Sequence, residues 1–251
     1  MKSMDLINNL WELINASKHC IAFTGAGVST LSGIRDFRGK NGLYTTVDAS
    51  RMFDIDLFFQ DPSVYYRMAK DFIYNLNEKE PSVVHRVLAA LERQNLIQAV
   101  ITQNIDLLHE KAGSKNVIEL HGSPAVHFCP SCGYKTDFES VTRIVQSGEL
   151  PLCPECKRVL KPEIVFFGEN LPKDAFKRAT HEAENTDLML VLGSSLVVYP
   201  AASIPSITFR SGGKLVIVND QPTDMDRHAC MHFIDLGKTF DTLEALMKVR
   251  F

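Results

Sequence analysis

The stretch CIAFTGAGVST, residues 20–30, decides the fold of this 251-residue chain. Its apolar first half is typical of a buried strand, and the two glycines that follow allow a sharp turn into a helix that Ser29 or Thr30 can cap. A parallel sheet presents backbone N–H groups to a phosphate at such a strand–turn–helix junction. The stretch therefore predicts an α/β fold with a phosphate-binding first turn. A tight turn without a ligand is the alternative.

The dinucleotide fingerprint is incomplete in this chain. A hydride-transfer Rossmann site reads G-x-G-x-x-G and has an acidic residue about 20 residues further on, at the end of the second strand. Thr30 occupies the third glycine position, and Asp48, at the right distance, follows no convincing buried strand. We therefore expect a dinucleotide-binding protein that is not an ordinary dehydrogenase.

Composition and charge are those of an ordinary enzyme. Hydrophobic residues make up 45% of the chain and charged residues 23%, and the formal net charge of -3 argues against a nucleic-acid-binding surface. No stretch approaches 18 apolar residues, and the first residues lack the apolar core of a signal peptide. We expect a cytoplasmic protein with no membrane span and no stable nucleic-acid partner.

Four of the six cysteines predict a metal site. Cys129 and Cys132 form one C-x2-C pair, and after 20 residues Cys153 and Cys156 form a second. In a chain without a secretion signal, such pairs are typical of a tetrahedral zinc site rather than of disulfides. Because all four ligands are thiolates, the site is closed and the single zinc ion is expected to be structural. Cys20 is expected to be a small buried hydrophobe, and Cys230 has no assigned role.

The apolar patterns place the zinc module inside an α/β chain. They predict helices at 4–17, 62–77, 82–94, 172–185 and 239–249, and buried strands at 19–23, 99–102, 117–120, 188–192 and 214–219. The predicted class is α/β, a Rossmann-like parallel sheet with an inserted small zinc-binding module and a helical insertion. We expect one domain over 1–251, with a cofactor loop and the helical insertion at about 31–80 and the zinc module at about 123–160.

Small or polar residues follow five predicted strands. They are Gly25–Gly27, Gln103–Asp106, His121–Gly122, Gly193–Ser195 and Asn219–Asp220. In an open parallel sheet, ligands bind beyond the carboxyl ends of the strands. Turn chemistry explains any one of these groups but explains all five together poorly.

Among these residues His121 is the candidate general acid–base, because imidazole titrates near neutral pH. A satisfied structural histidine is the alternative, and it is the interpretation favoured for His85 and His109, which lie in apolar surroundings. Asn104 and Asp106 are suited either to orient a polar ligand or to cap the helix that begins there.

In order along the chain, these motifs resemble those of sirtuins, the NAD-dependent protein lysine deacylases. The matching segments are GAGVS at 25–29, GIRDFRG at 33–39, TQNID at 102–106, HG at 121–122, the four cysteines, and GSS at 193–195. The resemblance runs from about residue 21 to residue 219 and is strongest to compact bacterial members. Arg35 departs from the family pattern, in which many members have proline.

The resemblance implies a role for each matched residue. His121 would be the general base on a ribose hydroxyl, and Asn104 would help to position the ribose. The residues that would hold NAD are Gly25, Ala26, Thr30, Phe37, Arg38, Gln103, Ile105, Asp106, Gly193, Ser194, Ser195, Asn219 and, on a shorter match, Thr239. The substrate peptide would pair as an added strand with residues from Val165, Phe166, Phe167, Gly168, Val197 and Tyr199.

The reaction that the resemblance implies is transfer of an acetyl group from lysine to ADP-ribose, with release of nicotinamide from NAD as co-substrate. Acetylated-lysine proteins would be the substrates. Members that prefer acidic acyl groups carry a tyrosine followed three residues later by an arginine. Here Tyr66 is followed by Ala69, so acetyl is expected over succinyl. The alternatives are a protein ADP-ribosyltransferase, a lysine deacylase for longer or acidic chains, and a non-enzymatic zinc-ribbon module.

Overall fold

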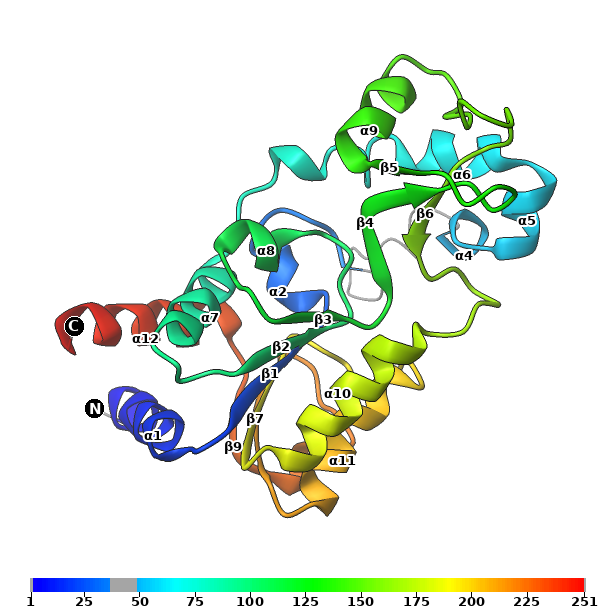
Figure 1. Ribbon diagram of the computed structural model, residues 1–251. Helices are drawn as coiled ribbons and strands as arrows, with labels where there is room; N and C mark the ends of the chain where they lie inside the picture. Colours follow the sequence, from blue (N-terminus) through cyan, green and yellow to red (C-terminus); the bar gives the residue numbers. More distant parts are fainter. Residues whose placement is uncertain (1, 37–48, 251) are drawn as a thin grey trace.

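The computed structural model describes residues 2–36 and 49–250, which form two lobes (Figure 1). Within these residues, the larger lobe holds a six-stranded sheet and the smaller lobe a three-stranded sheet. The two termini lie side by side on the larger lobe, far from the smaller one (Figure 1). No helix in the described part of the chain combines the length and apolar character that crossing a bilayer demands.

The larger sheet is parallel throughout and has the strand order β3-β2-β1-β7-β8-β9. The strands are β1 (Cys20–Thr24), β2 (Ala99–Thr102), β3 (Val117–Glu119), β7 (Leu188–Leu192), β8 (Lys214–Val218) and β9 (Ala229–Phe233). This is the doubly wound order, in which the direction of winding reverses between β1 and β7. The structure confirms the predicted Rossmann-like sheet and places its ligand crevice at the carboxyl ends of β1 and β7.

Helices cover both faces of this sheet (Figure 1). One face packs against α1 (Lys2–Ala16), α7 (Val83–Arg93) and α12 (Leu236–Arg250), and the other against α10 (Lys173–Asn185) and α11 (Ile204–Arg210). Successive side chains of β1 alternate between the two cores, so Ala22 joins the first and Phe23 the second. Burial on both faces explains why the central strands read as continuous apolar runs.

The smaller lobe combines two insertions that lie far apart in the sequence. The first contributes α4 (Ala49–Met52), α5 (Ile55–Gln60), α6 (Pro62–Ala69) and the 3-10 turn η1 (Leu76–Glu78). The second contributes β4 (Gly122–Phe128), β5 (Lys135–Asp137), α9 (Phe138–Gln146) and β6 (Lys161–Ile164). They share one apolar core, in which the ring centroids of Phe58 and Phe166 lie 5.4 Å apart. The helical insertion and the zinc module therefore pack around one common core.

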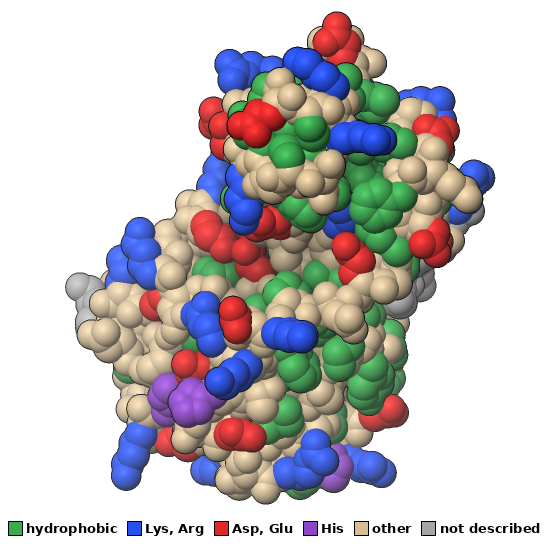
Figure 2. All heavy atoms as spheres, turned by 45° about the vertical axis from the view of Figure 1, so that its right-hand side comes forward, with side chains coloured by type: hydrophobic (Ala, Val, Ile, Leu, Met, Phe, Trp, Pro, Cys, Tyr) green, Lys and Arg blue, Asp and Glu red, His purple; other side chains and the backbone are tan. Residues whose placement is uncertain are grey.

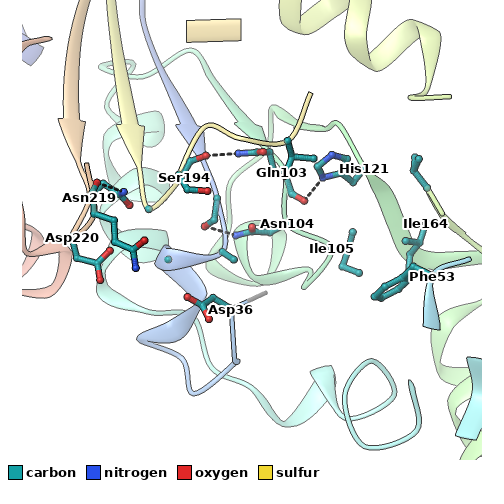
Figure 3. Close-up of a pocket in the computed structure, with 18 of the residues that line it drawn as sticks. Asp36, Phe53, Gln103, Asn104, Ile105, His121, Ile164, Ser194, Asn219 and Asp220 are labelled. Carbon is teal, nitrogen blue, oxygen red and sulfur yellow. Dashed lines mark hydrogen bonds between the residues drawn. The ribbon is translucent and has the colours of Figure 1, made fainter. Parts of the chain in front are cut away.

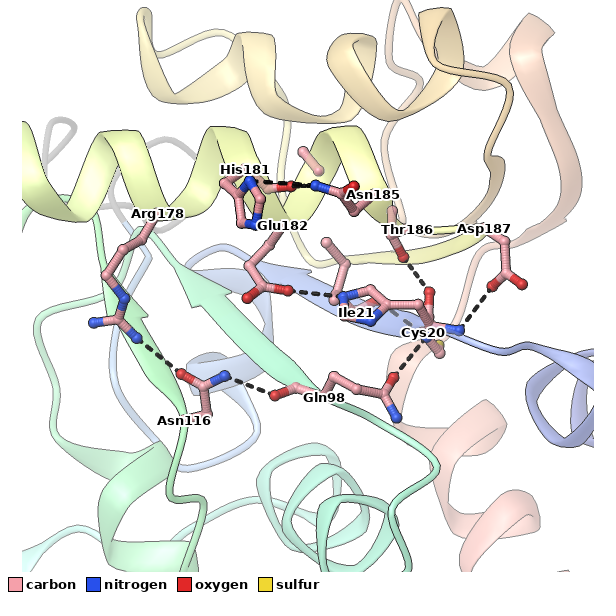
Figure 4. Close-up of polar contacts among 12 residues, drawn as sticks. Cys20, Ile21, Gln98, Asn116, Arg178, His181, Glu182, Asn185, Thr186 and Asp187 are labelled. Carbon is pink, nitrogen blue, oxygen red and sulfur yellow. Dashed lines mark hydrogen bonds and ion pairs between the residues drawn. The ribbon is translucent and has the colours of Figure 1, made fainter.

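The amino-terminal edge of the larger sheet is closed by polar side chains (Figure 4). His19 Nε2 lies 2.8 Å from Glu182 on α10, and the Gln98 side-chain oxygen accepts the Cys20 N–H at 2.7 Å. The Asp187 carboxylate accepts the Lys18 N–H at 2.9 Å. Cys20 itself is buried, and that burial raises the pKa of its thiol, which confirms the expected small hydrophobe. These contacts leave the opposite edge of the sheet for a ligand.

The secondary structure differs from expectation in several places, and the strands β4, β5 and β6 of the smaller lobe are among the elements that were not expected. The single helix expected at 62–77 is two elements, because α6 ends at Ala69 and the chain turns before η1 begins. The helix α11 and the strand β9 were not expected. α11 has only seven residues with Pro205 in its first turn, and β9 is a half-exposed edge strand without a continuous apolar run. Both patterns are too short or too mixed for a periodic signal.

Candidate active site

The glycine turn after β1 packs directly on the turn after β7. The Gly25 N–H donates to Leu192 O at 3.0 Å, and the Gly27 N–H donates to Gly193 O at 2.9 Å. A Cβ on Gly25 would lie 2.7 Å from Gly193 O, and one on Gly193, whose φ is +60°, would lie 2.7 Å from Val28 N. Only glycine permits this approach. The two turns together form the floor of the crevice where the sheet reverses direction.

A cleft opens above this floor, between the two lobes. The molecular surface is hollowed where the two lobes meet (Figure 2). Of the predicted site residues, the cleft brings together Gly25, Ala26, Gln103, Asn104, Ile105, His121, Val165, Phe167, Gly193, Ser194, Ser195 and Asn219. Gly27 and Asp220, which were expected at strand ends, also line it, as do residues that sequence reasoning missed, namely Asp36, Phe53, Ile164, Val198 and Gln221. Phe53 and Ile164 had no signal, since each is one apolar residue among many until the small lobe folds.

The cleft is polar at one end and apolar at the other (Figure 3). Asn219 and Asp220, after β8, lie at one end, while Phe53 and Ile164 of the small lobe lie at the other. His121 lies on the side of the apolar residues. This polarity suits a ligand with a nucleotide at one end and an apolar group at the other.

Three predicted residues lie against the cleft rather than in its lining. Asp106 is buried, where its carboxylate accepts the Ser29 hydroxyl and, at 3.0 Å, the Leu108 N–H at the start of α8 (Leu108–Ala112). Thr30 donates its hydroxyl to Gly27 O at 2.8 Å, within α2 (Gly27–Thr30). These two side chains support the strand-end loops, and Gly168 turns the loop after Phe167 with a φ of +95°.

Other predicted residues lie further from the lining. The Phe166 ring points into the core of the small lobe, 5.1 Å from the Tyr65 ring. Thr239 is buried in α12. Val197 and Tyr199 are 56% and 72% exposed, on either side of the cleft-lining Val198. Phe37, Arg38 and Asp48 lie outside the described residues.

Side-chain amides cross-link the strand-end loops (Figure 3). Gln103 Nε2 donates to Ser194 Oγ at 2.8 Å, which joins the loop after β2 to the loop after β7. Asn104 Nδ2 donates to Gly25 O and to Ser29 Oγ, both at 3.0 Å. Because both amide protons of Asn104 are used, its Oδ1 is the atom that can accept a hydrogen bond from a ligand. The amides join the loops of the floor and leave an acceptor for a hydroxyl.

The ring of His121 is oriented by the backbone. Its Nδ1 lies 2.8 Å from Gln103 O. A carbonyl oxygen can only accept, so Nδ1 carries the proton and donates it. In the neutral ring the lone pair is therefore on Nε2, which is the atom able to act as a base. His121 thus combines a place in the cleft with a defined tautomer.

Two other histidines are excluded from the chemistry by burial. His85 Nδ1 accepts from the Ser82 hydroxyl at 2.8 Å, and His109 Nε2 lies 3.0 Å from Thr24 Oγ1. Burial lowers the pKa of His85 to about 4 and holds the pKa of His109 well below its usual value. Both rings are neutral at physiological pH and neither lines the cleft, which favours the expected structural role, but His85 Nε2 and His109 Nδ1 are buried without a hydrogen-bond partner among the described residues.

The four paired cysteines converge on one point. Their sulfur atoms all lie within 4.8 Å of one another, with Cys129 Sγ 3.3 Å from Cys156 Sγ and Cys132 Sγ 3.5 Å from Cys153 Sγ. Sulfurs that surround a single zinc at about 2.3 Å are spaced on this scale. The donors therefore fit one closed structural zinc site, as the spacing predicted.

The part of the cleft lining that the structure describes offers no lysine or arginine to an acidic acyl group. Among the described residues that line it, Asp36 and Asp220 are charged, and none is Lys or Arg. The Tyr66 ring is buried, and its hydroxyl donates to Leu160 O at 2.5 Å. Arg67 beside it is exposed. The tyrosine that matched the acidic-acyl pattern is therefore part of the core of the small lobe.

The fold and the cleft define a dinucleotide-binding α/β protein with a zinc-bearing second lobe. A sequence model described as the Sir2 family matches residues 25–200. An NAD-dependent protein deacetylase of Thermotoga maritima is 50% identical over 222 residues, which are 88% of this chain and 90% of that protein. The chain belongs to the Sir2 family.

Other relatives and solved structures agree. An NAD-dependent protein deacylase of Thermococcus kodakarensis is 42% identical over 85% of this chain and 84% of its own. A structure of Sir2 with a p53 peptide and NAD+ superposes with a TM-score of 0.87 at 45% identity, covering 97% of this chain and 98% of that one. A structure of Sir2Tm with a propionylated peptide has a TM-score of 0.86 at 44% identity, with the same coverage.

Proposed function

We propose that this protein is an NAD-dependent protein lysine deacetylase, which transfers the acetyl group to ADP-ribose and releases nicotinamide. The observation that carries the proposal is His121, which has a defined tautomer and lies in a cleft that is polar at one end and apolar at the other. Acetylated-lysine proteins are the proposed substrates.

NAD is the proposed co-substrate, and it supplies the nicotinamide leaving group and the ribose that takes the acyl group. The turn at Gly25 and Ala26 presents backbone to its phosphates, and Ser194 and Ser195, in the neighbouring turn after β7, line the cleft beside it. Asn219 lies at the polar end of the cleft, where the adenosine would bind. The Oδ1 of Asn104 accepts a ribose hydroxyl, which positions the sugar for reaction.

His121 takes up the proton of a ribose hydroxyl at Nε2, while the Gln103 carbonyl stabilises the protonated ring through Nδ1. The side chains of Phe53, Ile105 and Ile164 form the apolar end of the cleft. They exclude water from the acyl group, which limits hydrolysis of the co-substrate.

The acyl preference proposed is for small neutral groups, acetyl above succinyl. Among the described residues, an anionic acyl chain would meet an apolar wall that offers its charge no cationic partner, and moving an unpaired charge out of water is costly. Longer neutral chains are the closer alternative, since the wall itself is apolar. The peptide on either side of the lysine would lie between the segment at Val165–Gly168 and the segment at Val197–Tyr199.

We further propose that the enzyme acts in the cytoplasm. The cysteine cluster supports this location, because four thiolates that hold zinc stay reduced in a reducing compartment.

The test is to incubate the protein with NAD and an acetyl-lysine peptide and to follow the products by mass spectrometry. Deacetylated peptide, nicotinamide and O-acetyl-ADP-ribose should form in equal amounts. ADP-ribose on protein without deacetylation would instead identify an ADP-ribosyltransferase, and reduced-cofactor absorbance would identify a dehydrogenase. A matched succinyl-lysine peptide should turn over more slowly than the acetyl peptide. Faster turnover would reverse the acyl preference.

A further inference from the structure

Lys161, the first residue of β6, is a cation in the interior of the small lobe. Its side chain is 3% exposed. Its Nζ donates to Ile164 O at 2.8 Å and to Pro162 O at 3.3 Å, and it lies 2.9 Å from Glu169 Oε2. The same ammonium lies 4.1 Å from the centroid of the Phe166 ring. A lysine is rarely buried to this extent unless its charge is paired. The Glu169 carboxylate and the face of the Phe166 ring provide that pairing.

Glu169 links this buried charge to the backbone of the loop after β6. One carboxylate oxygen, Oε2, contacts both Lys161 Nζ and the Phe166 N–H, the latter at 2.7 Å. The Glu169 N–H donates in turn to Phe166 O at 3.0 Å. Both polar groups of the Phe166 backbone are therefore satisfied by a single residue, which folds 166–169 into a tight turn.

The residues on either side of Phe166 are the ones that line the cleft. Val165 donates its N–H to His121 O at 2.8 Å, and Phe167 donates its N–H to Phe53 O at 2.6 Å. The Phe166 ring packs in the aromatic core, 5.6 Å from Phe53 and 5.4 Å from Phe58. Lys161 does not line the cleft. Lys161 instead contacts Phe166, the inward-facing residue of this segment, while its neighbours Val165 and Phe167 line the cleft.

We infer that the Lys161–Glu169 pair is a positioning device for the substrate peptide. By fixing the turn at 166–169, the pair sets how Val165 and Phe167 face the acyl-lysine, so its loss weakens peptide binding and leaves NAD binding unaffected. The NAD floor is built from the loops after β1 and β7, in the other lobe, and shares no contact with this pair. The inference rests on the proposed deacetylase activity.

A second ion pair in the same three-stranded sheet provides a matched control. Lys135 on β5 contacts Glu163 on β6 at 2.5 Å, but both side chains are well exposed. Exposed pairs contribute little. Lys135→Met removes the same kind of charge from the same sheet without touching the loop after β6.

The experiment measures steady-state constants for acetyl peptide and for NAD in four variants. Lys161→Met should raise the KM for peptide about tenfold, which corresponds to about 1.4 kcal/mol. Its KM for NAD and its kcat should stay within about twofold of the unmodified protein, a split that indicates lost peptide binding. Glu169→Gln should change the peptide KM in the same direction, Lys161→Arg should recover most of the loss, and Lys135→Met should have no effect.

If Lys161→Met does not fold, Glu169→Gln still tests the inference, because the Gln side chain keeps an acceptor for the Phe166 N–H and removes only the negative charge. Equal rises in both KM values, an unchanged peptide KM in these variants, or the same effect in Lys135→Met would overturn the inference. If the unmodified protein fails to deacetylate the peptide, the proposed function fails instead, and the two failures are thereby distinguished.

Discussion

At the scale of single residues, the cleft depends on atoms whose roles are set by their neighbours. His121 becomes a base at Nε2 because a carbonyl fixes the proton on Nδ1. Asn104 becomes an acceptor because the backbone and Ser29 use its two amide protons. The residue types were visible in the sequence, but the choice of reacting atom came from the hydrogen bonds.

Replacing His121 with Asn should remove the base while leaving a side-chain donor for the Gln103 carbonyl. We expect deacetylation, measured as kcat/KM, to fall about 10²-fold or more, as is typical when a general base is lost. NAD affinity by calorimetry and the thermal midpoint should change little, because the ring is not part of the core. Retained turnover would remove His121 from the catalytic role.

At the scale of elements, the crevice depends on two turns that touch. Gly193 has a φ of +60°, and a Cβ there would lie 2.7 Å from Val28 N and 2.8 Å from Gly27 Cα. The zinc module depends on a comparable convergence, of two knuckles on one metal. In both cases two separate loops together form one binding site.

Gly193→Ala should test the contact between the two turns. The methyl group adds left-handed strain to a collision with backbone, so we expect a loss of about 3 kcal/mol in the free energy of unfolding and weaker NAD binding. Gly212→Ala is the control, since its φ is +91° and no atom lies within 4 Å of the added Cβ. Gly212→Ala should lower the free energy of unfolding by the backbone strain alone, about 1 kcal/mol, and leave the NAD affinity unchanged. Urea unfolding and calorimetry measure both quantities, and equal losses in the two variants would refute the close contact.

Cys129→Ala should release zinc, because the remaining three thiolates no longer close the site. We expect metal content by mass spectrometry to fall below one ion per chain and the thermal midpoint to drop. Cys230→Ala, an exposed cysteine outside the cluster, should keep both unchanged. A Cys129 variant that melts like its parent would contradict a structural zinc.

At the scale of the whole molecule, stability should depend on pH through the buried histidines. His85, His109 and His127 are held neutral by burial, with the pKa of His85 lowered to about 4, that of His127 lowered to about 3 and that of His109 well below its usual value. Their unfolded pKa is near 6.5, so the unfolded chain binds more protons below that pH. The stabilisation is complete above pH 6.5 and declines as the pH falls towards 4.

Urea titrations between pH 7.5 and 4.5 check this expectation. Each histidine should contribute a slope of up to about 1.4 kcal/mol per pH unit below pH 6.5. His85→Gln should remove the contribution of one histidine to the slope of the unfolding free energy below pH 6.5. The slope above pH 7 should stay unchanged. A variant with the same acid limb as its parent would exclude His85 as a source of the pH dependence.

How much of the molecule could be predicted depends on how local the signal is. Helices expected at 4–17, 82–94 and 172–185 appear at Lys2–Ala16, Val83–Arg93 and Lys173–Asn185, because each has a long amphipathic pattern. The zinc cluster followed from cysteine spacing alone. The edge strand β9, the short helix α11 and the cleft-lining residues Phe53 and Ile164 had no local pattern.

The sequence by itself predicted the parallel sheet, the zinc ligands and the polar residues at five strand ends, since apolar runs, cysteine spacing and the residues that directly follow a strand are local properties of the chain. Only the tertiary structure decided that the helical insertion and the zinc module share one core, that Phe166 points into it, and that Lys161 and Glu169 pair beneath the cleft. The physical reason is that these features depend on contacts between segments many residues apart, and side-chain direction is settled by the packing that those contacts create.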